Sequence, residues 1–129
     1  MVCLDTNIII DFLKKKVYAI NRLKELNDEN ISLSTTSVNT FELYGGVIKS
    51  GYQDSIHPLN ALLNNIKIIN LDLNSSKKAA EIFEDLKSKG EIIDLADIMI
   101  ASIAITNKES LLTENKNHFK RIKELILEE

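Results

Sequence analysis

Two acidic residues stand where the sequence is otherwise apolar, which makes them candidates for chemistry. Asp5 directly follows the apolar run 2–4, and Asp97 interrupts the mainly apolar segment 95–105. Burying an unpaired carboxylate is costly, so Asp97 needs a cation, hydrogen-bond donors or a metal ion beside it. Asp94 lies three residues earlier, on the same face of a helix. The pattern predicts a metal or acid–base site that includes Asp97.

The acids also have a purely structural interpretation. Asp is a favoured N-cap, so Asp5 and Asp94 each fit the residue that begins a helix. Asp97 fits that role less well, because it lies inside an apolar helix. Asp5 and Asp94 therefore stay open between a capping role and a site role.

Glu42 is a further candidate, on a helix predicted over 37–49. The apolar residues of that helix predict a core-facing stripe made of Val38, Phe41, Tyr44 and Ile48. Glu42 lies off this stripe, so a solvated side chain is its default interpretation. Asn39 shares its face, and the Gly45–Gly46 pair would let a ligand approach closely. These two features favour a site without establishing one.

Short β-like runs alternate with longer helix-like segments along the chain. Strands are predicted at 2–4, 31–35, 67–71 and 111–113, with an edge strand at 125–127. Helices are predicted at 8–16, 17–27, 37–49, 54–65, 75–89, 95–106 and 116–122. Strands separated by helices imply parallel pairing through right-handed crossovers. The expected fold is a three-layer α/β/α fold with a central parallel sheet, as a single domain over 1–129.

The composition predicts a cytoplasmic protein. The longest mainly apolar stretch without a charge, 98–107, is too short for a membrane-spanning helix. The apolar N-terminal residues carry Asp5 and Asp11 and precede lysines 14–16, the reverse of a secretory signal. The single cysteine, Cys3, excludes an intramolecular disulfide and is expected to be a small buried side chain.

Four segments, taken in order, resemble the signatures of the PIN-domain family of metal-dependent ribonucleases, most closely its VapC-type toxins. They are residues 2–7 (VCLDTN), 37–45 (SVNTFELYG), 94–101 (DLADIMIA) and 112–119 (LTENKNHF). The resemblance covers essentially the whole chain. It implies a sheet of four or five strands in the order 3-2-1-4-5, with the acids at the carboxyl edge.

The resemblance also implies a role for each residue that falls on a family position. The three acidic metal ligands correspond to Asp5, Glu42 and Asp97. Thr6 falls on the hydroxyl that orients the first of them, and Asp94 on a frequent additional acid that adds to the metal site. The fourth position, Asp or Asn in the family, is Asn115 here, which weakens a second metal site without removing the first.

The donor set supports this assignment on physical grounds. Carboxylates crowded at one sheet edge repel one another, so cations are needed to neutralise them. Oxygen ligands without nearby Cys or His favour Mg²⁺ or Mn²⁺ over Zn²⁺. One or two such ions can activate water and stabilise the leaving oxygen of a phosphodiester. The implied activity is hydrolytic, endonucleolytic cleavage of RNA.

The resemblance implies protein partners as well. A VapC-type toxin binds a small VapB-like antitoxin, whose C-terminal segment covers the groove and brings a basic side chain to the acidic pocket. Family members commonly form homodimers, and residues 38–48 and 54–63 offer surfaces for one. Without an antitoxin, the chain would be a stand-alone PIN nuclease in RNA processing.

Other classes fit less well. A receiver domain of two-component signalling needs an acid pair after the first strand, and a haloacid-dehalogenase-like phosphatase needs an Asp at position 7. Here Asp5 is followed by Thr6 and Asn7. A PIN-like module that binds RNA or protein without cleavage stays open, although intact ligand positions argue against it. His118 is a candidate base, with packing or exposure as the alternative.

Net charge alone argues against a nucleic-acid partner. Sixteen basic against nineteen acidic residues give a formal charge of -3, without the positive excess typical of such proteins. Setting aside the four acids of the candidate site leaves fifteen acids and an excess of one positive charge. Because the deficit is concentrated where metal would bind, RNA binding is expected to depend on the metal.

Overall fold

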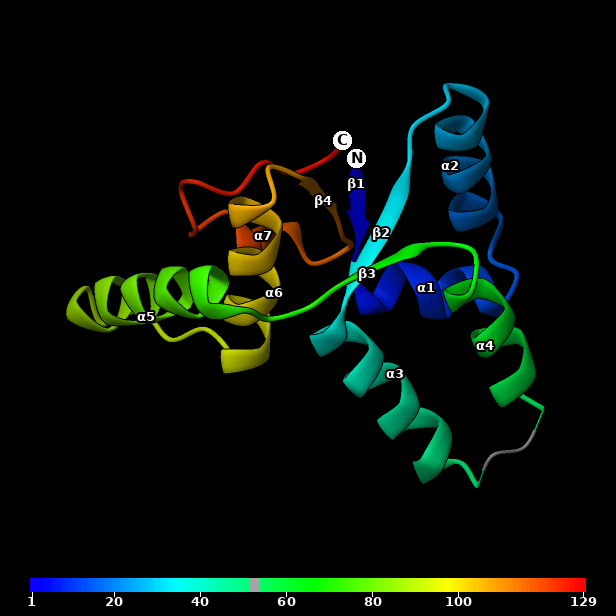
Figure 1. Ribbon diagram of the computed structural model, residues 1–129, viewed down its shortest axis with the longest axis horizontal. Helices are drawn as coiled ribbons and strands as arrows, with labels where there is room; N and C mark the ends of the chain where they lie inside the picture. The colour runs from blue at the N-terminus through cyan, green and yellow to red at the C-terminus, as the bar shows by residue number, and fades with distance from the viewer. Residues whose placement is uncertain (52–53) are drawn as a thin grey trace.

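The computed structural model describes residues 1–51 and 54–129, and its elements follow the predicted alternation (Figure 1). The strands are β1 (Val2–Leu4), β2 (Leu33–Thr36), β3 (Lys67–Ile69) and β4 (Ser110–Leu112). The helices are α1 (Thr6–Leu13), α2 (Val17–Asp28), α3 (Ser37–Lys49), α4 (Ile56–Leu63), α5 (Leu73–Ser88), α6 (Leu95–Thr106) and α7 (Lys116–Phe119). β1, α3 and α6 have the predicted bounds, and the other elements differ by a few residues at their ends. None of the helices in the two described ranges is long and apolar enough to cross a membrane.

The four strands form one parallel sheet in the order β3-β2-β1-β4. Cys3 in the central strand β1 pairs with Ser34 of β2 and with Leu111 of β4. The predicted edge strand at 125–127 is reduced to one parallel bridge between Leu111 and Leu127. Helices α5, α6 and α7 lie on one side of the sheet, and α1, α2 and α4 on the other (Figure 1). The three-layer α/β/α fold is thus confirmed, with a single bridge in the fifth position.

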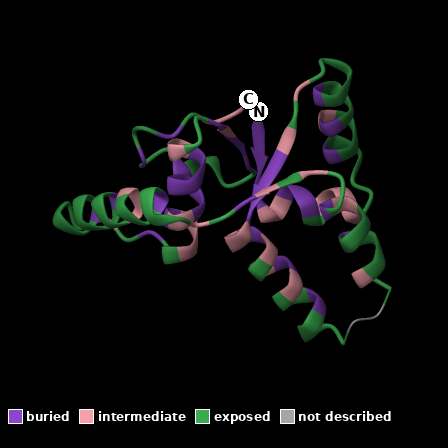
Figure 2. Ribbon diagram, viewed as in Figure 1, coloured by how far each residue is buried: buried purple, intermediate pink, exposed green. Residues whose placement is uncertain are grey.

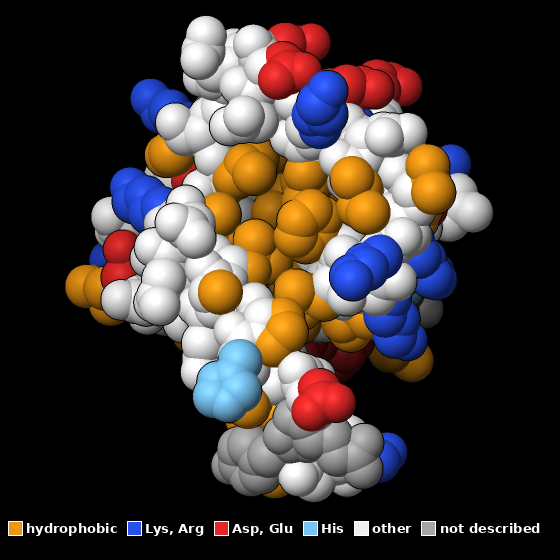
Figure 3. All heavy atoms as spheres, turned by 90° about the vertical axis from the view of Figure 1, so that its right-hand side faces the viewer, with side chains coloured by type: hydrophobic (Ala, Val, Ile, Leu, Met, Phe, Trp, Pro, Cys, Tyr) orange, Lys and Arg blue, Asp and Glu red, His pale blue; other side chains and the backbone are white. Residues whose placement is uncertain are grey.

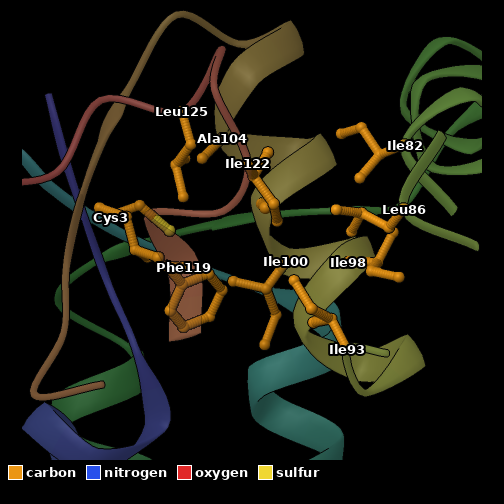
Figure 4. Close-up of a cluster of buried hydrophobic side chains, with 12 residues drawn as sticks. Cys3, Ile82, Leu86, Ile93, Ile98, Ile100, Ala104, Phe119, Ile122 and Leu125 are labelled. Atoms are coloured by element: carbon orange, nitrogen blue, oxygen red, sulfur yellow. The ribbon is translucent and has the colours of Figure 1, made fainter. Parts of the chain in front are cut away.

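Successive side chains of β1 point to opposite faces of the sheet, and each face has its own core. Cys3 packs among side chains of α5, α6 and the C-terminal region, including Ile100 and Phe119 (Figure 4). Val2 and Leu4 pack on the other face against α1 to α4. The middle of α6 is buried on nearly all sides (Figure 2). Because α6 is packed on nearly all sides, the position of Asp97 in its first turn is fixed.

α3 turns a different face to the core from the one predicted. Phe41 is 78% exposed and Ile48 is 56% exposed, whereas Asn39, Leu43 and Val47 are buried. Thr36 caps the helix in a capping box with Asn39, so the buried face begins with a hydrogen-bonded amide. The prediction was wrong for Phe41 and Ile48, because the helix carries a second apolar stripe, Leu43 and Val47, which follows the capped Asn39 at helical spacing and is the one that is buried.

The core between the sheet and α1 to α4 is incompletely covered. Several apolar side chains packed around it are only partly buried: Phe12, Leu13, Ile31, Leu33, Tyr44, Ile56, Leu62, Ile66 and Ile68. Figure 3 shows hydrophobic side chains gathered at the centre of the face that carries α2 and α4, with charged side chains around them. A patch of this kind is typical of a surface that binds a partner.

A buried polar cluster lies near the amino end of β4. Glu109 is 3% exposed, and its carboxylate accepts a hydrogen bond from the buried Ser34 hydroxyl. Burial, and secondarily the charge of Glu109, raises the pKa of the neighbouring Cys3 thiol to about 12. Cys3 is thus a buried, un-ionised thiol, as expected.

Replacing Ser34 with Ala is expected to lower the free energy of unfolding by about 1–3 kcal/mol, because the buried Glu109 carboxylate loses this donor. Urea unfolding followed by circular dichroism measures the change. In a Glu109→Met background the same substitution should cost clearly less. An equal cost in both backgrounds would instead assign the effect to packing around Ser34.

Candidate active site

The Asp5 carboxylate is buried at the carboxyl end of β1 and held by four donors. It is 4% exposed and caps α1. Its Oδ1 accepts from the Thr6 backbone N–H at 2.8 Å and from Asn39 Nδ2 at 3.1 Å. Its Oδ2 accepts from Thr113 Oγ1 at 2.6 Å and from Asn7 Nδ2 at 3.3 Å. Asp5 therefore caps α1 and also lies at the carboxyl edge of the sheet, where the candidate site was predicted. Neutral donors fix the orientation of its carboxylate.

Glu42 is connected to this network through a hydroxyl group. Thr6 Oγ1 donates to Glu42 Oε1 at 2.6 Å and accepts from Asn39 Nδ2 at 2.9 Å. The resemblance implies that the Thr6 hydroxyl orients the first acid. In the structure it orients Glu42 instead, and the backbone N–H of Thr6 is the group that reaches Asp5. Glu42 is thus held in the site rather than extended into solvent.

Asp97 lies in the first turn of α6 and faces the other acids. Its pKa is raised from 3.8 to about 6, first by burial and then by the negative charges of Asp5, Asp94 and Glu42. Burial by itself raises the pKa of a carboxyl, and like charges nearby raise it further. The contributions of Asp5, Asp94 and Glu42 show that the four acids singled out in the sequence lie near one another.

Asp94 and Asn115 lie at the margin of this group. Asp94 precedes α6 as its N-cap and makes no side-chain capping bond. Asn115 is exposed, and its backbone N–H donates to Thr113 Oγ1 at 3.0 Å. The residue after β4 that contacts Asp5 is therefore Thr113, which sequence reasoning missed. A polar residue directly after a buried strand was the available signal.

The residues fit a hydrated divalent cation. Within residues 1–51 and 54–129, no three acidic, His or Cys side chains form a ready-made ion site. Mg²⁺ keeps several water ligands and takes one or two carboxylates directly, so it does not require such a cage. Burial, and then the repulsion of neighbouring carboxylates, raises the pKa of Asp97, and a cation would relieve the repulsion. Asp5, Glu42, Asp94 and Asp97 are the residues that would hold it.

A groove of about 580 Å³ leads away from Glu42 between α1, α3 and α4. Its apolar lining includes Ile10, Leu13, Val47 and Leu59, and Lys14 and Asp54 line it as well. The groove therefore joins an apolar surface to the acidic site.

A three-layer α/β/α fold with acids at the carboxyl edge of its sheet defines a PIN-like class of protein. Residues 2–125 match the family model described as the PIN domain, and the chain belongs to this family. Ribonuclease VapC1 of Methanocaldococcus jannaschii is 35% identical over 123 residues, covering 95% of this chain and 82% of that protein.

Solved structures are similar over nearly the full chain. VapBC2 from Rickettsia felis, bound to a DNA fragment from the VapBC2 promoter, has a TM-score of 0.90 at 34% identity, covering 99% of this chain and 98% of its own. VapBC-1 from nontypeable Haemophilus influenzae has a TM-score of 0.83 at 27% identity, covering 100% of this chain and 98% of its own. These likenesses agree with the family assignment and with the strand order described above.

Proposed function

We propose that this protein is a Mg²⁺- or Mn²⁺-dependent endoribonuclease, the toxin of a VapBC-type toxin–antitoxin pair, built as one domain over 1–129. The observation that carries the proposal is the gathering of acids at the carboxyl edge of the sheet. Asn39 and Thr6 link Asp5 to Glu42 through hydrogen bonds, and burial together with three neighbouring carboxylates raises the pKa of Asp97. Relatives named ribonuclease VapC align with nearly the whole chain. The two similar solved structures described above are those of VapBC proteins.

In this proposal, Asp5, Glu42 and Asp97 bind one or two ions, with Asp94 beside them. When bound there, a divalent ion would supply an activated water and positive charge beside a phosphodiester. The donors around Asp5 keep its carboxylate in place, and Thr6 holds Glu42 toward the same site. Asn115 supplies a neutral amide at the edge, which is consistent with a weaker second ion position.

The proposal includes a VapB-like antitoxin as partner. The groove beside Glu42 has a mainly apolar lining that also includes Glu42, Asp54 and Lys14. These properties suit a segment with apolar side chains and one cationic side chain that reaches the carboxylates. A homodimer is also proposed, and the exposed Phe41 and Ile48 lie within its expected surface at 38–48.

The test is cleavage of tRNA, rRNA and mRNA by the purified full chain. We expect cleavage with Mg²⁺ or Mn²⁺, none in EDTA, and none by the Asp97→Asn variant. A contaminating nuclease would be unaffected by the substitution, so the variant is the necessary control. EDTA should also weaken RNA binding, because uncompensated acids repel the phosphate backbone.

Two outcomes would overturn parts of the proposal. RNA binding without cleavage at every ion tested would indicate a non-catalytic PIN-like module. Cleavage without a neighbouring gene for a short DNA-binding protein would favour a stand-alone PIN nuclease in RNA processing.

A further inference from the structure

α7 is fixed against the core by the residue that ends it. Phe119 is fully buried and lies near Cys3 of β1 and Ile100 of α6 (Figure 4). The backbone N–H groups of His118 and Phe119 both donate to the Asn115 carbonyl, at 3.1 and 3.2 Å. The anchored Phe119 and these bonds hold the preceding residue, His118, in a defined place.

The His118 imidazole points toward the acidic site. Its Nε2 lies 3.4 Å from Oδ2 of Asp97, although the side chain as a whole is 28% exposed. This Nε2 is buried and has no hydrogen-bond partner within the described parts of the chain. A buried nitrogen is costly to leave without a hydrogen bond. A shorter contact between Nε2 and the Asp97 carboxylate in the metal-loaded site would satisfy it.

Asp97 lacks the support that the other ligands have. Asp5 accepts from four donors, and Glu42 accepts from Thr6. Among residues 1–51 and 54–129, the Asp97 carboxylate accepts no hydrogen bond, and the nearest basic group is His118 Nε2 at 3.4 Å. Contacts in unliganded active sites are often long and tighten once the site is loaded.

We propose that His118 is a positioning residue that orients the Asp97 carboxylate for the divalent ion. The inference rests on the proposed metal-dependent function. A donor on Oδ2 leaves Oδ1 directed to the cation, and partners of this kind commonly hold metal ligands in place. His118 therefore acts through Asp97 and contacts neither the ion nor the RNA.

Calorimetric titration of the metal-free full chain with Mn²⁺ tests this role. His118→Ala should weaken Mn²⁺ binding about 10- to 100-fold. His118→Gln should restore most of the affinity, because its amide nitrogen can occupy the position of Nε2. Asn117→Ala, an exposed neighbour on the same short helix, is the matched control and should bind as the wild type does.

RNA cleavage provides the second measurement. Activity of His118→Ala should recover when the Mn²⁺ concentration is raised, with the KM for RNA unchanged at saturating ion. Normal Mn²⁺ affinity in His118→Ala, or a raised KM for RNA at saturating ion, would overturn the inference. A wild type that neither binds Mn²⁺ nor cleaves RNA would overturn the proposed function instead, so the two failures are distinguishable.

Discussion

Replacing Asp97 with Asn is expected to abolish RNA cleavage and, at the same time, to stabilise the metal-free protein at pH 8. The loss of activity should reach at least about 100-fold, since even outer partners of metal ligands contribute about 10- to 100-fold. The gain in stability follows from the raised pKa of this carboxyl, about 6 in the folded protein. An ionised Asp97 is poorly solvated and repelled by its neighbours, and Asn removes that charge.

The stabilisation should depend on pH with a defined sign. The folded-state pKa lies above the unfolded value, so the folded state binds more protons between pH 4 and pH 6. The stability contributed by Asp97 is present below pH 4 and is lost as the pH rises through about 6. The variant should therefore match the wild type at the acidic end and exceed it at pH 8 by about 1–2 kcal/mol.

Thermal unfolding in EDTA at pH 4 and at pH 8, followed by the same scans with Mn²⁺, measures both effects. Mn²⁺ should raise the Tm of the wild type and leave Asp97→Asn nearly unchanged, because the ion binds the folded site. A variant less stable than the wild type at pH 8 in EDTA would show that the Asp97 charge is favourably paired.

The fold was largely predictable because its signals are local. α3 begins at a side-chain cap, and α6 is an apolar run between Asp94 and Asn107; both have the predicted bounds. The edge strand predicted at 125–127 is present as one parallel bridge between Leu111 and Leu127. Two backbone hydrogen bonds hold it, from the Leu111 N–H to Ile126 and from the Glu128 N–H to Leu111. The predicted face of α3 was wrong because the helix has two apolar stripes, and the buried one is the stripe of Leu43 and Val47 that begins with the amide of Asn39.

The acidic residues of the site could be predicted from the sequence, whereas the neutral residues that donate hydrogen bonds to them could not. Asp97 is conspicuous because one charge interrupts an apolar helix. Thr113 and Asn39 are ordinary polar residues in the sequence, 108 and 34 positions from Asp5. Their role exists only once β1, β4 and the start of α3 lie side by side. The sequence therefore identifies acidic residues that are costly to bury, because they interrupt apolar segments. The neutral donors that offset this cost come from distant parts of the chain and are identified only by tertiary contacts.

Asn39 is the neutral residue on which most of this network depends, and replacing it with Ala should impair both folding and catalysis. It is fully buried, and its Nδ2 donates to Asp5 and to Thr6. Its Oδ1 accepts from the backbone N–H and hydroxyl of Thr36. The substitution leaves a buried carboxylate short of a donor and removes one half of a helix cap. We expect a loss of about 2–4 kcal/mol in the free energy of unfolding.

Asn39→Asp separates the two consequences. Asp keeps the acceptor for Thr36, so the cap of α3 should persist, but it replaces the donor to Asp5 with a negative charge. RNA cleavage should therefore fall as far as in Asn39→Ala, while Mn²⁺ restores more of its stability than it restores to the Ala variant. Ser75→Ala is the matched control, because Ser75 is equally buried in the capping box of α5. It should lower the urea midpoint without reducing the cleavage rate of the folded protein; a parallel loss of cleavage would mean that helix capping in general, and not the contact with Asp5, limits activity.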